Sequence, residues 1–364
     1  MRATIAKTAA TVALAAALGA WGCGKSGSSK ADGGADGDTD TDVECAWRVM
    51  IGPEEEPHEG RFRGMTVCGQ DEAYLVAGYP TEDDKPSEIL ELQDGQWSKL
   101  PEQPEGFSSN RYFSDMFCVE PGIIVGVGRD RSSDNGVVAI YENETWTWQD
   151  LPEVPHLREV YADSPENIYA TGDEATVVHY DGESWISEQL PDVNEDLKLR
   201  AVWCSGNEAF VGGDFNIYTC YVCHKSGGVW QRLEMSDLWT RPLSFWGTGL
   251  SDLYLGFIAD GPDQTMLLKW EGGEWVPFEE YWYDQQTDHG FSMIADMWGL
   301  SIDDLYAVEY QYRNLWHKEG DSWQLVLSPD VQLDGIYPRI EEVLGSSEEN
   351  VFAMGNGIYR YSCQ

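Results

Sequence analysis

VYADSPENIYATGDEATVVHYDGESW, from Val160 to Trp185, is the stretch that decides the fold. Three segments within it are rich in β-branched and aromatic residues, and turn-forming residues at 164–167 and 181–182 bound them. This pattern predicts three short β-strands connected by tight turns. So small a sheet cannot bury both of its faces, and it therefore needs neighbours of its own kind.

The same pattern recurs along the chain beyond Cys45. Most second strands end on a glycine, and most third strands run into a turn before a tryptophan that begins a fourth strand. Phe257 and Glu309 stand in place of that glycine, so we expect the fifth and sixth units to be irregular. Four strands with a period in the forties of residues predict propeller blades. The seven first strands contain residues 66–68, 116–118, 160–161, 202–204, 245–247, 297–299 and 343–345.

The last unit stops at Gln364, before its fourth strand. The segment from Cys45 to Met50 has the pattern of the missing strand, so it is predicted to complete the last blade and close the ring. The fold class is therefore all-β, a seven-bladed propeller of four-stranded blades. Cys45 and Cys363 would then lie close enough to form a disulfide, which would stabilise the fold by about 3–5 kcal/mol.

The other cysteines of the predicted propeller fit an exported protein. Cys68 and Cys118 occupy equivalent first-strand positions in adjacent blades, so a disulfide between them is a second candidate. Cys204, Cys220 and Cys223 leave an odd one out, and their pairing stays open. Cys220 and Cys223 have CxxC spacing, but no second such pair exists to complete a zinc site. We expect a structural disulfide or buried thiols there, and no metal.

The N-terminus has the features of an export signal. Residues 1–22 combine a basic start, an apolar run and small residues, which is typical of a signal peptide. Gly22-Cys23 resembles the end of a bacterial lipobox, so Cys23 is predicted to be lipidated; the alternative is a simple secretory signal cleaved nearby. Residues 23–44, rich in Gly, Ser and Asp, are predicted to be a flexible acidic linker. The propeller then spans residues 45–364.

From residue 45 onward the chain resembles bacterial lipoprotein β-propellers whose blades repeat the theme VWGSSxxDVYAVGxxGxIxHYDGxxW. The theme is clearest in Val160–Trp185, Met297–Ala307 and Leu344–Gly355. Its glycine after the second strand is loosely similar to kelch repeats, whereas WD-repeat signatures and the sialidase Asp-box are absent. The resemblance implies a fold and an envelope location, and it implies no particular activity.

The net charge of −41 bears on the partners. Coulomb repulsion excludes nucleic acid as the main partner, and it limits membrane contact to a lipid anchor. A ligand with cationic groups is compatible with this charge, and so is a plain adaptation for solubility. We expect a monomer.

Six arginines lie just before, or a few residues upstream of, a predicted first strand. In a propeller this places them near one rim, where a cationic ring would hold a carboxylate, a sulfate or an anionic sugar. The alternative is that each pairs with a local acid, such as Glu159 or Glu341, and holds the blades together. The six are Arg63, Arg111, Arg158, Arg200, Arg241 and Arg339.

The longest insertion, Val276 to Ser292, is expected on the same face. Its Tyr281, Trp282 and Tyr283 are candidate ligand-binding residues, since aromatic faces stack on sugar rings or on methyl-bearing groups. The alternative is that these aromatic side chains are buried over a blade edge. The nearby Asp-rich loops have no ligand spacing specific enough to predict calcium.

The sequence contains no HExxH motif, GxSxG elbow or P-loop. We therefore predict no catalytic residues and no cofactor. The leading hypothesis is an exported, membrane-anchored binding or scaffolding module for a protein or a glycan. It would act in the cell envelope, at the outer membrane or cell surface rather than the inner membrane. The alternative is a polysaccharide hydrolase or lyase, and a third possibility is a structural surface protein without a small ligand.

Overall fold

The computed structural model describes residues 45–52, 62–78, 87–108, 110–149, 151, 153–216, 219–235, 239–259, 265–280, 282–284, 289–291 and 293–363. The predicted signal peptide, lipidation site Cys23 and linker lie outside these residues. In the described part of the chain, no helix is long and apolar enough to cross a membrane.

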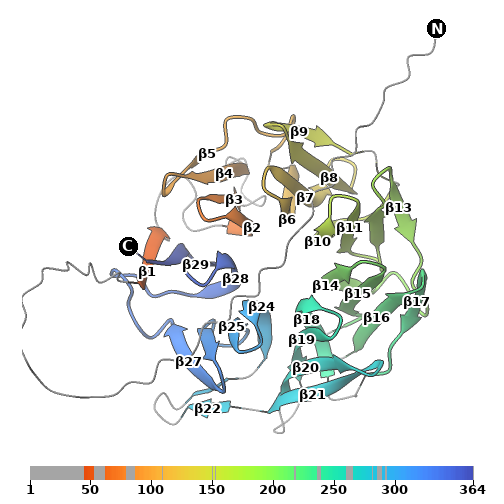
Figure 1. Ribbon diagram of the computed structural model, residues 1–364. Coiled ribbons are helices and arrows are strands. Elements are labelled where there is room, and N and C mark those ends of the chain that lie inside the picture. Colours follow the sequence, from red (N-terminus) through yellow and green to blue (C-terminus); the bar gives the residue numbers. More distant parts are fainter. Residues whose placement is uncertain are drawn as a thin grey trace, which may run out of the picture. The chain divides into compact units, whose positions relative to one another are not determined.

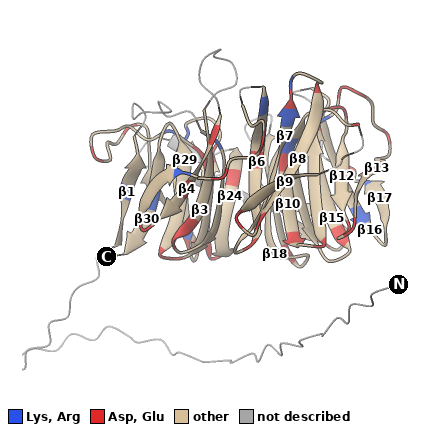
Figure 2. Ribbon diagram, turned by 90° about the horizontal axis from the view of Figure 1, so that it is seen from above, with Lys and Arg blue, Asp and Glu red and all other residues tan. Residues whose placement is uncertain are grey.

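Seven four-stranded antiparallel sheets are arranged around a common centre, which confirms the predicted seven-bladed propeller (Figure 1). A separate two-stranded sheet, β22 (Trp282–Asp284) with β23 (His289–Phe291), lies within the predicted insertion. Figure 2 shows acidic residues in red and basic residues in blue on the strands and connecting loops of the blades.

The blades follow the chain in order. The first four are β2 (Phe62–Gly69), β3 (Glu72–Ala77), β4 (Glu88–Gln93), β5 (Gln96–Lys99); β6 (Arg111–Glu120), β7 (Ile123–Asp130), β8 (Asn135–Glu142), β9 (Thr145–Trp148); β10 (Leu157–Ser164), β11 (Asn167–Gly172), β12 (Val177–Tyr180), β13 (Trp185–Glu188); and β14 (Lys198–Ser205), β15 (Glu208–Asp214), β16 (Cys220–Ser226), β17 (Val229–Arg232). The last three are β18 (Trp239–Gly249), β19 (Asp252–Ala259), β20 (Thr265–Glu271), β21 (Glu274–Glu280); β24 (Ile294–Ser301), β25 (Asp304–Glu309), β26 (Leu315–Glu319), β27 (Ser322–Leu327); and β28 (Ile340–Ser347), β29 (Asn350–Gly355), β30 (Ile358–Cys363), β1 (Cys45–Ile51).

The third blade, β10 to β13, is the stretch with which the sequence analysis began. Its second and third strands pair Tyr169 opposite His179, and the two rings stack with centroids 4.1 Å apart. The same stacked pair recurs at equivalent positions as Phe210–His224, at 4.2 Å, and Tyr306–His317, at 4.0 Å. These histidines therefore belong to the repeat and hold neighbouring strands together.

The hydrophobic core lies between successive blades. One cluster joins Val125 and Val138 of the second blade to Leu157, Ile168 and Trp185 of the third. Each sheet thus buries a face only against its neighbour, as expected of a stacked repeat.

The N-terminal strand closes the ring as predicted. β1 pairs antiparallel with β30, with Cys45 opposite Cys363, and a disulfide joins these two cysteines. Trp47 of β1 contacts Tyr306 of the sixth blade, with ring centroids 6.2 Å apart. The first and last strands therefore complete one blade and help to seal it against its neighbour.

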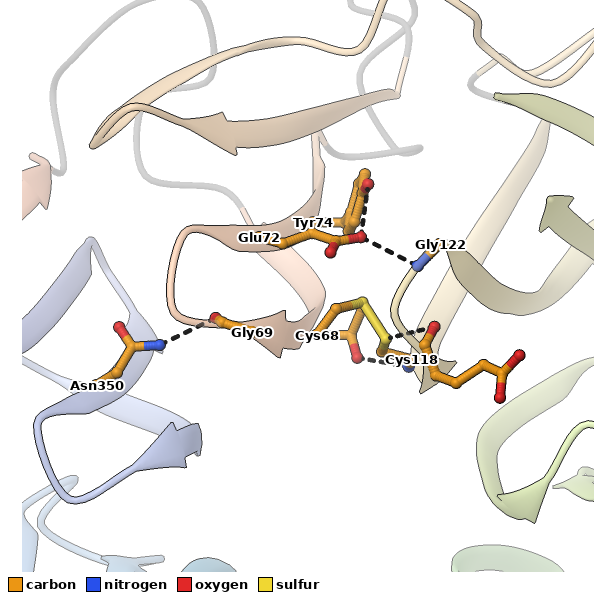
Figure 3. The surroundings of a disulfide bond; sticks show 9 residues. Cys68, Gly69, Glu72, Tyr74, Cys118, Gly122 and Asn350 are labelled. Atoms are coloured by element: carbon orange, nitrogen blue, oxygen red, sulfur yellow. Dashed lines mark hydrogen bonds between the residues drawn. A yellow bond between two sulfur atoms is a disulfide. The ribbon is translucent and has the colours of Figure 1, made fainter. Parts of the chain in front are cut away.

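The second predicted disulfide, Cys68–Cys118, joins β2 to β6 across the first blade interface (Figure 3). The same interface is bonded by the Gly122 amide, which donates to Glu72 Oε1 at 3.2 Å. On the other side of the first blade, Asn350 Nδ2 donates to the Gly69 carbonyl at 3.1 Å. Each contact links a turn or strand of one blade to the next.

The remaining described cysteines, Cys204, Cys220 and Cys223, carry free thiols. Burial raises the pKa of Cys220 to about 12 and that of Cys223 to about 11. These thiols are therefore protonated at neutral pH and poor nucleophiles. The structure thus favours buried thiols over a third disulfide.

Glycine at the end of the second strand is required by close packing in four blades. A Cβ atom on Gly128, Gly172, Gly213 or Gly355 would lie 1.8–2.2 Å from a carbonyl oxygen at the start of the first strand. In the sixth blade Glu309 fills this position and is fully buried; its Oε2 accepts hydrogen bonds from Asn314 at 2.8 Å and Trp316 at 3.3 Å. The irregularity expected for this unit is thus a local substitution within a complete blade.

Candidate functional site

A cavity of about 530 Å³ is lined by residues of all seven first strands, β2, β6, β10, β14, β18, β24 and β28. Each first strand has a bulge at or near its beginning that shifts its register against the second strand, as between Leu157 and Glu159. Bulges redirect side chains, and here they define equivalent levels along the cavity wall.

The residue directly after the bulge is acidic in four of the seven blades. Asp115, Glu159, Asp296 and Glu342 all line the cavity at this level, which we call the carboxylate level. Gly64, Ala201 and Ser244 take the equivalent positions in the other blades.

Three of these carboxyl groups also join successive blades, and one of them, Glu342, accepts the Met65 amide of the first blade. Asp115 Oδ2 accepts the Val160 amide at 2.9 Å, and Asp296 Oδ2 accepts the Val343 amide at 2.9 Å. Glu159 differs: within the described part of the chain, its carboxylate accepts no hydrogen bond. Asp115 and Asp296 therefore have a structural role that Glu159 does not share.

All four carboxyl groups are harder to ionise than usual. Burial raises the pKa of Asp115 to about 7 and that of Asp296 to about 6. Burial, and then the charges of Asp115 and Asp296, raise the pKa values of Glu159 and Glu342 well above the usual range. The cavity therefore holds protons near neutral pH that the same groups would release in water.

Replacing Glu159 with glutamine is expected to stabilise the protein near pH 8 and to change little near pH 4. In the folded state Glu159 keeps a proton that it releases above about pH 4 in the unfolded chain. The contribution of this protonated group to stability is therefore lost as the pH rises through the folded-state pKa. Glutamine stays neutral throughout. Urea unfolding should show a gain on the order of 1–3 kcal/mol near pH 8.

Glu183→Gln is the matched control, since Glu183 is an exposed acid in the same blade. It should leave the unfolding midpoint unchanged at both pH values. A Glu159→Gln midpoint at or below wild type near pH 8 would show that the ionised carboxylate is stabilised in the cavity.

Aromatic side chains line the same cavity two residues further along the first strands. Phe117, Tyr161, Trp203, Trp246 and Trp298 occupy this aromatic level, and Thr66 and Leu344 take the remaining two positions. The Phe117 and Tyr161 rings are 4.8 Å apart between centroids, and Tyr161 and Trp203 are 6.5 Å apart. The level is therefore continuous from the second to the fourth blade.

The structure brings together some of the six arginines. Arg63, Arg158 and Arg200 line a smaller hollow of about 250 Å³, together with Ser114 and Glu159. Arg158 donates to both oxygens of Asp173, at 2.7 and 2.9 Å, and Arg200 Nε lies 2.6 Å from Asp214 Oδ2. Arg241 Nε approaches the same Asp214 oxygen at 3.4 Å.

Arg111 and Arg339 lie apart from this group. Arg111 stacks over Trp148, 4.1 Å from its ring centroid, and is 3.5 Å from Asp130. Arg339 is bonded to Asn356 through its backbone: its amide donates to Asn356 Oδ1 at 2.9 Å, and its carbonyl accepts the Asn356 amide at 3.1 Å. The acids that pair with the arginines are Asp130, Asp173 and Asp214, where the sequence analysis had named Glu159 and Glu341. Anion binding by the arginines stays a prediction.

A serine and a histidine meet at the mouth of the cavity. Ser114 Oγ is 2.6 Å from His156 Nε2, and His156 Nδ1 is 3.7 Å from Asp173 Oδ2. Burial lowers the pKa of His156, so its imidazole is neutral at pH 7. Asp173 is already bonded through both oxygens to Arg158, and 3.7 Å is too long for a hydrogen bond. We interpret this contact as a link between the second and third blades.

The candidate residues Tyr281, Trp282 and Tyr283 have side chains outside the described residues. Their role in binding stays a prediction. In the described residues, no group of three His, Cys, Asp or Glu side chains is placed to hold a metal ion.

The carboxylate and aromatic levels were missed by the sequence analysis. Their signal is an acid, an apolar residue and an aromatic residue in consecutive positions, as in Asp115-Met116-Phe117, Glu159-Val160-Tyr161 and Asp296-Met297-Trp298. An alignment of the seven predicted first strands on one another would have revealed it.

Comparison with known proteins shows the fold alone. No protein-family profile matches the chain, and no curated protein is similar to it in sequence. Among solved structures, YCF48 bound to D1 peptide is 15% identical, with 87% of this chain and 96% of that chain covered and a TM-score of 0.58. The WD40 repeats of RRP9 are 10% identical, with 89% and 100% covered and a TM-score of 0.61.

A third similar structure is the extracellular domain of BT4673 from B. thetaiotaomicron. It is 10% identical, covers 88% of this chain and 40% of its own, and has a TM-score of 0.54. All three likenesses are below 25% identity and support a β-propeller with repeated blades.

Proposed function

We propose that this protein is a binding module that holds a peptide segment of another protein at its central cavity. We further propose that it is exported, anchored in the cell envelope through a lipid on Cys23, held off the membrane by residues 23–44, and monomeric. The observation that carries the binding proposal is the cavity of about 530 Å³ at the meeting point of seven blades. Concave sites with apolar walls and a few convergent polar groups are typical binding sites.

The similar structures support the choice of a protein ligand over a glycan. One of them holds a peptide, and another is an extracellular domain. The N-terminal sequence supports export, since a signal-like segment, Cys23 and an acidic spacer follow one another. Catalysis has weaker support, because the Ser114–His156 contact lacks an acid hydrogen-bonded to the histidine.

Peptide binding is expected to depend on an open cavity mouth. Leu243 lines the cavity, so Leu243→Trp should weaken binding to an array of envelope-protein peptides. Val229→Trp, on an outer strand at 59% exposure, should not weaken it.

Lipid anchoring is expected to depend on Cys23. When cells that produce the protein are fractionated, Cys23→Ser should move the protein out of the membrane fraction.

Equal peptide binding by Leu243→Trp and wild type would place the ligand elsewhere. Binding to a glycan array with none to peptides would replace the proposed ligand class. Retention of Cys23→Ser in the membrane fraction would refute the lipid anchor.

A further inference from the structure

The central cavity combines an aromatic level with a carboxylate level in one wall. We propose that this cavity binds an organic cation, an alkylammonium or guanidinium group, whose charge lies among Asp115, Glu159, Asp296 and Glu342 and whose carbon chain packs against the aromatic level. The inference rests on the proposed function, because it identifies the chemical group that the cavity recognises.

The aromatic level favours a cation over a neutral or anionic group. Five of its seven positions carry aromatic rings, whose faces attract cations by about 0.5–2 kcal/mol each. Phe117, Tyr161 and Trp298 are only partly buried, so they keep surface free on the cavity side. A tail of methylene groups gains from the same contacts by leaving water.

The carboxylate level brings four acidic groups to one cavity, and a bound cation would favour their ionised forms. Burial keeps the pKa of Glu159 well above its usual range even though Arg158 and Arg200 lie nearby, and both arginines are bonded to acids outside this level, Asp173 and Asp214. Among the described residues, Glu159 accepts no hydrogen bond, so its oxygens remain available to a donor. A carboxylate with free acceptor oxygens in a cavity wall can take charge-assisted hydrogen bonds from the N–H groups of a cation.

An organic cation fits better than an inorganic one. In the part of the chain that the structure covers, no three acidic, His or Cys side chains converge closely enough to hold a metal ion. The acids instead belong to four different blades around the cavity, so a ligand with several N–H donors can reach more than one of them. The aromatic rings beside these acids provide no ligand atoms for a hydrated metal ion, whereas they can pack against an alkylammonium chain.

Binding should release protons. The protonated acids face one another across the cavity, with Arg63, Arg158, Arg200 and Glu341 near the mouth. A cation placed among these acids favours their ionised forms, so protons leave as it enters. This predicts affinity that increases from pH 6 to pH 8 and a measured binding enthalpy that depends on the buffer.

The test is calorimetry on the full chain with spermidine, with a short acetylated peptide containing two lysines, and with the same peptide acetylated on both lysines. We expect spermidine, the peptide with two free lysines, or both to bind. The peptide whose two lysines are acetylated should bind at least about tenfold more weakly than the cationic probes. Glu159→Gln/Glu342→Gln should weaken cation binding at least about tenfold, and Glu183→Gln should not. Trp298→Leu tests the aromatic level without a change of charge.

The sources of the cation are distinguished by the probes. Binding of the lysine peptide alone identifies a basic segment of a partner protein, and binding of spermidine alone identifies a free polyamine. Equal binding of the lysine and acetyl-lysine peptides would overturn the inference, as would unchanged affinity in the double variant with a normal unfolding curve. If neither cation binds while array peptides still depend on Leu243, the inference fails and the proposed function stands.

Discussion

Gly172→Val is expected to leave little folded protein at physiological temperature. Gly172 ends β11 in the third blade, and a Cβ there would lie 2.0 Å from the His156 carbonyl oxygen and 2.9 Å from Leu157 Cα. Both contacts are with backbone, which has no alternative rotamer. The strands would have to separate, although the Asp173 amide donates to that same carbonyl at 3.0 Å. Overpacking a core costs about 1–3 kcal/mol, and we expect the upper end or more.

Gly69→Ala provides the matched control. Its Cβ would meet no atom within 4 Å, and its backbone is not in the positive-φ region. It should unfold at the wild-type urea concentration, whereas Gly172→Val should show a much lower midpoint or no native tryptophan fluorescence. A wild-type midpoint for Gly172→Val would mean that the third blade can separate its first two strands at no cost.

The glycine that ends most second strands could be recognised from the sequence. Gly172 and its equivalents recur at this position because the same close approach of backbone atoms is repeated in each of these blades. Phe257 and Glu309 were recognised as exceptions to this pattern. The contacts that their side chains make inside the protein could not be predicted from the sequence. Glu309 Oε2 accepts hydrogen bonds from Asn314 and Trp316, and which donors surround a buried acid depends on packing between strands. Periodicity therefore predicts the backbone better than it predicts the partners of one side chain.

The candidate site was harder to predict for a related reason. Glu159 is one of 64 acidic residues, and nothing in its immediate sequence separates it from a solvated neighbour. The bulge at Arg158 turns Glu159 toward the cavity, and a bulge is a property of strand pairing. Arg158 was predicted to lie just before a first strand and instead lies within β10, and its partner Asp173 lies beyond the second strand. The pairing register of the strands therefore determines which charged side chains lie next to one another.

Register also connects the fold to the proposed function. One residue of slip would exchange the faces of the strand on which Glu159, Val160 and Tyr161 lie. The buried Val160 and its equivalents resist that slip, since they pack in the core between blades. The cavity chemistry is thus stabilised by the same contacts that stabilise the blades, and ring closure holds all seven in place.

Removing the Cys45–Cys363 disulfide is expected to cost more stability than removing Cys68–Cys118. The first disulfide spans 318 residues and the second spans 50. Loop-closure entropy of the unfolded chain grows with the logarithm of loop length, so the longer loop should contribute about 1–2 kcal/mol more, within a total of about 5 kcal/mol. The pair of variants, Cys45→Ala/Cys363→Ala and Cys68→Ala/Cys118→Ala, removes two thiols in each case.

Urea unfolding of both variants under non-reducing conditions measures the difference. Without its disulfide, β1 retains its pairing with β30 and the contact of Trp47 with Tyr361, whose ring centroids are 5.7 Å apart. If Cys45→Ala/Cys363→Ala unfolds at the same urea concentration as the other variant, these contacts already keep the ring closed. A lower midpoint would instead show that the seventh blade depends on its covalent closure, because β1 is the only strand of that blade that comes from the other end of the chain.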